Sequence, residues 1–309
     1  MIQYLIILLD DTSVSFCHYD NPCTEQRLID IDTLRQGIRF AMMENLTIQF
    51  VYPNYELPKE YVAAIESIDH TKIKPMKDGA DVWVTDNIGS EYVDIPVVFR
   101  LRRLELFEKE TELSQMIGKS KRLNIILTDI DSFSEKDFEV YKKVLQRLSL
   151  KIERKYTDGE TPQVNVLTDR IMLSEMNNCG AGYTSIALAP NGKFYICPAF
   201  YYNDDNDFVG DLEIGFSIKN KQLYQLDYAP ICRHCDAWQC KRCIWLNKKT
   251  TREMNTPSHE QCVIAHIERN ASRELLNCIH KHDNHLSVKE EIKEIDYFDP
   301  FEKRSECQW

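Results

Sequence analysis

The chain has 309 residues, of which 43% are hydrophobic and 28% are charged, a composition typical of a folded globular protein and not of a disordered one. Acidic residues exceed basic ones by 11, and the isoelectric point is near 5.3. Nucleic-acid affinity comes mostly from clustered Lys and Arg, so this balance excludes an extended nucleic-acid-binding surface. At about 150 residues per domain, the length predicts roughly two domains.

We expect no membrane-spanning or export signal at the start of the chain. Its apolar run, Tyr4–Leu9, is closed by Asp10 and Asp11, whereas a membrane-spanning helix needs about 20 such residues. No positively charged segment precedes a longer apolar run, as it would in a secretory signal. We therefore expect a cytoplasmic protein without membrane association, whose thiols stay reduced.

Short apolar runs alternate with helical patterns up to about residue 170, which predicts βαβ units, a parallel sheet and the α/β class. The expected strands are Tyr4–Leu9, Thr47–Tyr52, Asp81–Thr85, Val97–Leu101, Leu123–Leu127 and Val164–Leu167. Apolar residues at helical spacing predict four helices, marked by Leu34, Ile38 and Met42, by Tyr61, Ile65 and Ile68, by Leu106, Leu113 and Ile117, and by Phe138, Tyr141, Leu145, Leu148 and Ile152. Six such strands would form an open sheet or an incomplete parallel (β/α)6 barrel.

Acidic residues follow four of the expected strands, at the ends where α/β folds keep their ligand sites. They are Asp10 with Asp11, Asp86, Asp129 and Asp169. A ring of carboxylates there would bind a cation, but Thr and Asp at such positions more often cap the following helix, and we favour caps.

After residue 172 the alternation of strands and helices stops. Two β-like runs, Tyr183–Ala189 and Lys193–Cys197, flank the turn sequence Pro190–Gly192 and predict a hairpin. Cysteine-rich loops then fill residues 230–262, and a helical pattern follows. We therefore predict domains at 1–172 and 173–285 and a charged tail at 286–309.

The eleven cysteines are unevenly distributed, and closely spaced pairs place two thiolates on one tight turn. Seven of them lie within residues 179–262: Cys179, Cys197, Cys232, Cys235, Cys240, Cys243 and Cys262. In a reducing compartment such a group indicates metal binding rather than disulfides. The spacing alone fits iron–sulfur clusters or a tetrahedral zinc ion.

The order of these seven cysteines resembles the SPASM domain, the C-terminal extension of radical SAM enzymes that modify peptides and proteins. The matching residues are Cys179–Gly182, Asn191–Pro198, the double pair within 232–243, and Pro257 before Cys262, although the inner spacings are shorter than in the family.

The SPASM resemblance implies two [4Fe-4S] ligand sets, one of Cys232, Cys235, Cys240 and Cys262, and one of Cys179, Cys197 and Cys243. The family's fourth ligand to the second of these sets lies just before its first cysteine, but residues 171–178 contain no cysteine. That cluster would have an open coordination position, a different ligand, or would not form.

A radical SAM domain carries the motif CxxxCxxC after its first strand. Here Ser13, Cys17 and Asp20 occupy its three positions, and Cys23 lies past a proline, outside the motif's turn. The segment Tyr52–Pro58 also lacks the glycines of the family's Gly-Gly-Glu-Pro turn. The chain thus resembles a degenerate radical SAM barrel, which implies that S-adenosylmethionine (AdoMet) is neither bound nor cleaved.

The opening Leu8–Tyr19, together with the SPASM-like end, resembles the CXXX repeat peptide maturases. This implies a protein that acts beside an intact radical SAM enzyme on a shared ribosomal precursor peptide with repeated cysteines, through peptide binding or electron transfer. The alternative is a zinc-stabilised peptide-binding or scaffold module without a redox role. An independent enzyme of another chemistry is a third interpretation.

Overall fold

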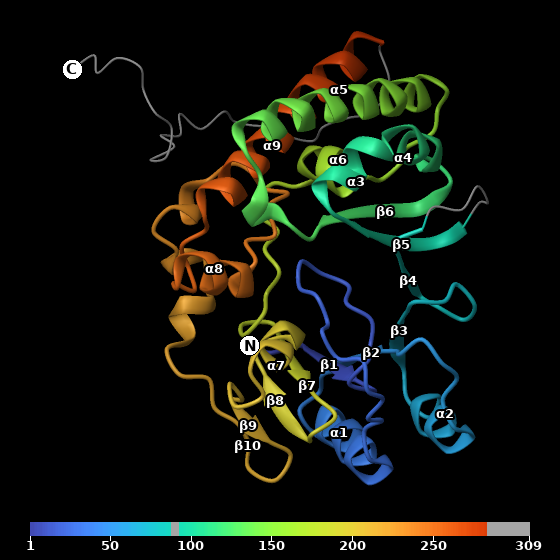
Figure 1. Cartoon of the computed structure of the whole chain (residues 1–309), viewed down its shortest axis with the longest axis vertical. Helices are drawn as coiled ribbons and strands as arrows, with labels where there is room; N and C mark the ends of the chain where they lie inside the picture. The colour runs from blue at the N-terminus through green and yellow to red at the C-terminus, as the bar shows by residue number, and fades with distance from the viewer. Residues whose placement is uncertain (88–92, 283–309) are drawn as a thin grey trace.

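A computed structural model describes residues 1–87 and 93–282, so the expected tail at 286–309 lies outside the described residues (Figure 1). The strands are β1 (Tyr4–Leu8), β2 (Thr47–Val51), β3 (His70–Lys74), β4 (Val82–Thr85), β5 (Val93–Leu101), β6 (Ser120–Leu127), β7 (Ser185–Leu188), β8 (Lys193–Tyr195), β9 (Gly210–Asp211) and β10 (Gly215–Phe216). The α-helices are α1 (Ile31–Met43), α2 (Lys59–Ile65), α3 (Arg103–Glu108), α4 (Glu110–Met116), α5 (Glu135–Thr157), α6 (Asn165–Met172), α7 (Pro198–Asn203), α8 (Ile244–Thr251) and α9 (His259–Lys281). Short 3-10 helices are η1 (Ile130–Ser132), η2 (Lys221–Tyr224), η3 (Leu226–Tyr228) and η4 (Cys232–His234).

The ten strands found among the described residues belong to one sheet, in the order β10-β9-β8-β7-β1-β2-β3-β4-β5-β6. Strands β1 to β6 are parallel neighbours in chain order, and β7 pairs parallel to β1 on its other side. The predicted α/β class and parallel sheet are confirmed. The βα repeat of a (β/α)6 barrel is interrupted, because no α-helix follows β3 or β4 among the residues described.

The helices begin where the sequence offers capping side chains. Asp30 accepts hydrogen bonds from two backbone N–H groups of α1, and Ser134 forms a capping box at the start of α5. The expected buried faces are present, with Leu34 on α1 and Tyr141 on α5 both in the core. Met42 is an exception, since its side chain is 64% exposed.

The predicted strand Val164–Leu167 is wrong. Only Val164 forms a bridge, to Leu123, and α6 begins at the next residue. The Asn165 side chain accepts from the backbone N–H of Ile125 (2.8 Å) and donates to its carbonyl (2.9 Å), so it takes the place of strand pairing. Because α6 is buried on most of its surface, its apolar run resembles that of a buried strand.

Sequence patterns missed β3 and the place of the hairpin in the sheet. β3 contains a single buried residue, Ile73, and its polar neighbours hide the strand pattern. The predicted hairpin is confirmed as β7 and β8, which pair antiparallel around a turn where Gly192 has φ +77°. The pairing of β7 with β1 extends the sheet across residue 172, and the domain boundary itself stays a prediction.

The sheet and helices enclose two hydrophobic cores. The core at the bottom of Figure 1 joins Leu5 and Phe50 to Phe194 of the hairpin. The core at the top joins Tyr141 of α5 to Leu275 of α9, and these two long helices lie against each other. Each core therefore combines segments from both sides of residue 172.

Leu148→Ala is expected to lower the free energy of unfolding by about 2–5 kcal/mol, because it removes a buried side chain and leaves a cavity. Leu148 on α5 is 1% exposed. The matched control is Leu150→Ala on the same helix, where the side chain is 56% exposed and the expected change is below about 0.5 kcal/mol. Urea denaturation measures both, and equal losses would contradict the packing of α5.

No helix in the described ranges is long and apolar enough to cross a membrane.

Candidate functional site

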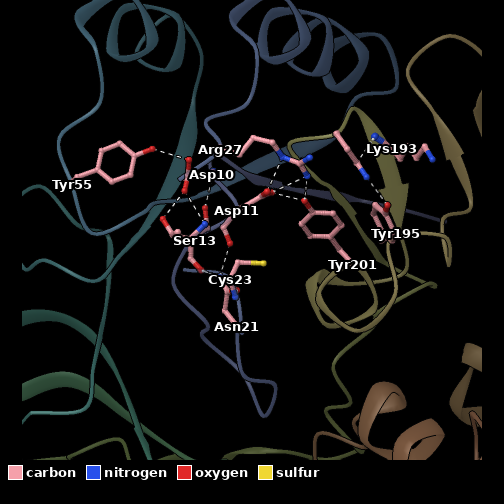
Figure 2. Close-up of polar contacts among 12 residues, drawn as sticks. Asp10, Asp11, Ser13, Asn21, Cys23, Arg27, Tyr55, Lys193, Tyr195 and Tyr201 are labelled. Atoms are coloured by element: carbon pink, nitrogen blue, oxygen red, sulfur yellow. Dashed lines mark hydrogen bonds and ion pairs between the residues drawn. The ribbon is translucent and has the colours of Figure 1, made fainter. Parts of the chain in front are cut away.

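Polar side chains occupy the C-terminal end of β1 (Figure 2). The Asp10 carboxylate accepts a hydrogen bond from the Tyr55 hydroxyl at 2.8 Å. Asp11 forms an ion pair with Arg27 (Oδ2 to Nε, 2.7 Å) and accepts from the Tyr201 hydroxyl. Both carboxylates are engaged within the chain, so they support the loop after β1 instead of forming part of a ring of ligands.

Two of the three positions at radical SAM spacing, Ser13 and Asp20, form polar contacts with other parts of the chain. Ser13 is fully buried, and its hydroxyl donates to the carbonyl of Val51 at 2.9 Å. The Asp20 carboxylate pairs with Arg100 of β5 at 2.8 Å. Only Cys17 offers a thiol at this spacing.

The structure brings four predicted ligands together: Cys232, Cys235, Cys240 and Cys262 line one small pocket. The pocket lies between the cysteine-rich loop and the first turns of α9. His266 of α9 also lines it, with Nε2 at 3.6 Å from the Cys235 sulfur. Sequence analysis missed this histidine, although its place one helical turn after Cys262 is a usable signal.

Arg242 reaches into this pocket from between two of the paired cysteines. Its side chain is 2% exposed, and its Nη2 donates to the carbonyl of Tyr224 at 2.9 Å. Within the described part of the chain, nothing accepts the Nε and Nη1 hydrogens. Buried cationic donors without acceptors are costly, and a metal centre with four thiolates is an anion. The donor set therefore fits a metal–thiolate group in this pocket.

The other predicted set, Cys179, Cys197 and Cys243, is also brought together. Each of these thiols interacts electrostatically with another of the set. The backbone N–H of Cys179 donates to the carbonyl of Lys241 at 2.9 Å, which holds the Cys179 loop against the loop that carries Cys243. Cys197 is the N-cap residue of α7.

In the pocket of Cys232, Cys235 and Cys240, burial favours the protonated form of the thiols in the metal-free chain. It raises the pKa of Cys240 to about 12 and that of Cys232 to about 11. Backbone N–H groups act in the opposite direction, and that of Ala237 lies 3.4 Å from the Cys235 sulfur. Metal binding must therefore release protons from this site.

Among the described residues, no three Cys, His, Asp or Glu side chains converge as they would around one metal ion. The two cysteine sets are thus close groups and not preassembled tetrahedral sites.

Glu268 of α9 is a partly buried carboxyl group in a second pocket, which Cys240 and Cys243 also line. The Tyr141 hydroxyl donates to Glu268 Oε1 at 2.7 Å. Burial raises the pKa of Glu268 to about 7, and hydrogen bonds from Tyr141 and Gln239 oppose this effect. The group therefore changes charge near neutral pH, and sequence analysis did not identify it.

Glu268→Gln is expected to remove part of the pH dependence of stability. In the unfolded chain this carboxyl titrates near 4.5, and in the folded chain at about 7. The folded state therefore retains a proton that the unfolded state releases, so wild-type stability falls as pH rises from 4.5 to about 7. Above pH 7 the variant should be more stable than wild type, and below pH 4.5 the two should be similar.

Urea denaturation between pH 4 and pH 8 measures this difference. Glu274→Gln on the exposed surface of the same helix is the control and should follow the wild-type profile. A Glu268→Gln profile parallel to wild type would show that this carboxyl does not titrate in that range.

No family model and no curated protein matches the chain. Among solved structures it is similar to hexahistidine-tagged anSMEcpe with bound AdoMet, with a TM-score of 0.63 and 11% identity over 92% of this chain and 100% of that one. Native anSMEcpe with bound AdoMet and the Cp18Cys peptide gives a TM-score of 0.63 and 11% identity over 91% and 100%. That protein is an anaerobic sulfatase-maturating enzyme of the radical SAM class with a SPASM domain. At this identity the likeness shows a shared fold.

Proposed function

We propose that this protein takes part in the maturation of a ribosomally synthesised precursor peptide with CXXX cysteine repeats, beside a radical SAM partner enzyme. The observation that carries this is the shared fold with a peptide-modifying enzyme, including a structure with bound peptide. The seven cysteines at SPASM-like spacing add to it, since they lie in two close groups on that fold.

We further propose that each group holds a [4Fe-4S] cluster within a SPASM-like domain at 173–285. Cys232, Cys235, Cys240 and Cys262 would hold one cluster, and Cys179, Cys197 and Cys243 would take part in the other. When bound, such clusters supply electron transfer or a site for a substrate thiolate. The unpaired donors of Arg242 support an anionic group at the first of these sites.

The N-terminal part, 1–172, would then act without AdoMet. Ser13 and Asp20 carry no thiol and are bonded to Val51 and Arg100, so three cysteines are not available after β1. In this proposal the barrel-like part contributes peptide binding and the partner enzyme contributes radical chemistry. Incubation of the reduced protein with AdoMet should yield no 5′-deoxyadenosine.

Iron, zinc and acid-labile sulfide per chain, after anaerobic purification and reconstitution, test the cofactor proposal. Two clusters predict about eight iron and eight sulfide, whereas one cluster predicts about four of each. Zinc without sulfide would overturn the iron–sulfur function and favour the zinc-stabilised module.

Binding of a fluorescent synthetic peptide with two CXXX repeats tests the peptide proposal. The matched control is the same peptide with serine in place of each cysteine. Tighter binding of the cysteine peptide is expected, and equal or absent binding of the two would overturn the proposed substrate class.

A further inference from the structure

The loop after β1 fixes Cys17 at the C-terminal ends of β5 and β6. Arg100 of β5 donates from Nε to the carbonyl of Cys17 at 3.0 Å and from Nη2 to that of Tyr19 at 2.5 Å. His18 Nδ1 lies 2.8 Å from the carbonyl of Leu127, the last residue of β6. The position of Cys17 is therefore set by a cation and two strand ends far from it in sequence.

His18, the residue after Cys17, lies beside the loop that carries Cys243. His18 lines the same pocket as Lys241 and Cys243. The Lys241 carbonyl in turn accepts from the backbone N–H of Cys179 at 2.9 Å. Cys17 is thus connected through His18 to Cys243 and Cys179, which belong, with Cys197, to the set that lacks a fourth cysteine (the incomplete set).

Tyr19, the next residue, contacts the helix that begins at Cys197, the third cysteine of the set. The Tyr19 ring stacks on Tyr202 of α7, with 5.8 Å between ring centroids. Cys197 caps the N-terminus of that helix. The thiol of Cys17 also interacts electrostatically with those of Cys179, Cys197 and Cys243.

We propose that Cys17 supplies the fourth thiolate of the cluster site formed by Cys179, Cys197 and Cys243. This inference rests on the proposed iron–sulfur function and completes the set for which residues 171–178 offer no cysteine. In this proposal Cys17, the one cysteine at radical SAM spacing after β1, binds a cluster in the cysteine-rich part of the chain instead of a radical SAM cluster. The Arg100 guanidinium, which donates to the carbonyl of Cys17, brings a cation to a site that gathers four negative charges.

The test isolates this site in the full-length chain. In a Cys235→Ser/Cys262→Ser background the other set cannot hold a cluster, so the remaining iron reports on the Cys17 site. Cys17→Ser and Cys23→Ser are compared there after reconstitution, by iron and sulfide content and by electron paramagnetic resonance. Cys23 is the matched control, because it lies in the same loop but is exposed, with Asp11 and Arg27 as its charged neighbours.

Cys23→Ser should keep about four iron atoms. Cys17→Ser should lose them, or keep a cluster that gives a three-iron signal on mild oxidation. Cys17→Asp should recover iron with an altered signal, because a carboxylate can bind iron, whereas a purely packing role would make this larger charged residue worse than serine. Thermal unfolding of the metal-free variants shows whether each one folds.

Equal iron content and equal resonance signals in Cys17→Ser and Cys23→Ser would show that Cys17 is not a ligand and would leave the proposed iron–sulfur function standing. Zinc without sulfide in the unsubstituted chain would instead overturn the iron–sulfur function. In that case the zinc content of the same two variants still decides whether Cys17 is a ligand.

Discussion

Asp236→Ala is expected to lower the free energy of unfolding by about 3–5 kcal/mol, because it leaves a buried arginine without its counter-charge. The Asp236 side chain is 3% exposed and bridges two helices. Its carboxylate pairs with Arg170 of α6 at 3.2 Å and with Arg269 of α9 at 2.6 Å. Arg170 is itself 3% exposed and also donates to the Asp236 carbonyl at 2.8 Å.

Two further variants separate charge from packing at this position. Asp236→Asn keeps a hydrogen-bond acceptor and should lose less stability than Asp236→Ala. Asp227→Ala, at an exposed aspartate in the 3-10 helix η3, should change stability by less than about 0.5 kcal/mol. Urea denaturation under reducing conditions measures the free energy of unfolding of all three variants. A loss of less than about 1 kcal/mol for Asp236→Ala is what an exposed ion pair would give, and it would contradict a buried one.

Asp236 follows Cys235 directly, so the same ion pairs position one side of the cysteine pocket. Burial and the Asp236 carboxylate raise the pKa of the Cys235 thiol, whereas Arg269 and Arg170 lower it, so the effect of Asp236 on the pocket is one of position. We therefore expect that Asp236→Ala weakens metal retention as well as stability.

The sequence could predict those parts of the fold in which local pattern and tertiary environment agree. In β1, β2 and β6 most of the apolar residues are buried, which gives each strand a recognisable pattern, and the long face of α5 repeats with helical spacing. It could not predict β3, where one buried residue gives no pattern, or α6, where Asn165 replaces a strand pairing with side-chain hydrogen bonds. The first error comes from a weak local pattern, and the second comes from contacts that are distant in the chain.

The same limit applies to the site. Regular spacing within 232–243 grouped the paired cysteines, and Cys262 was added through the family resemblance. No spacing could relate Cys17 to Cys179, because Cys17 is held by the ends of β5 and β6 and Cys179 by the backbone of Lys241, and these contacts are distant in the chain. The buried guanidinium of Arg242 and the partly buried carboxyl of Glu268 were equally hidden, since burial of a polar residue is a property of the packed structure.

The incomplete set of Cys179, Cys197 and Cys243 lies where the two hydrophobic cores meet. Cys197 packs against the core that contains β1 and β7, and Cys243 packs against the core that contains β6 and α9. A metal group that binds both would connect the two cores. We therefore expect that metal loading raises the cooperativity of unfolding as well as its midpoint temperature.

Cys262→Ser is expected to remove about four iron atoms per chain and most of the stabilisation that metal loading gives at its site. Cys262 is 8% exposed on the first turn of α9 and faces a pocket with Cys232, Cys235 and Cys240. A serine hydroxyl does not replace a thiolate as a ligand to iron. Because metal-binding free energy at such a site is folding free energy, the midpoint temperature of the loaded variant should fall toward that of the metal-free protein.

Cys278→Ser is the control, because Cys278 lies on the same helix but does not line the pocket. It should keep both the iron and the midpoint temperature of the loaded wild type. The metal-free forms of the two variants should unfold close to the metal-free wild type, which separates a lost ligand from a damaged core. If Cys262→Ser retained the iron and the metal-dependent rise in midpoint temperature, Cys262 would not be a ligand, and α9 would contact the pocket through packing alone.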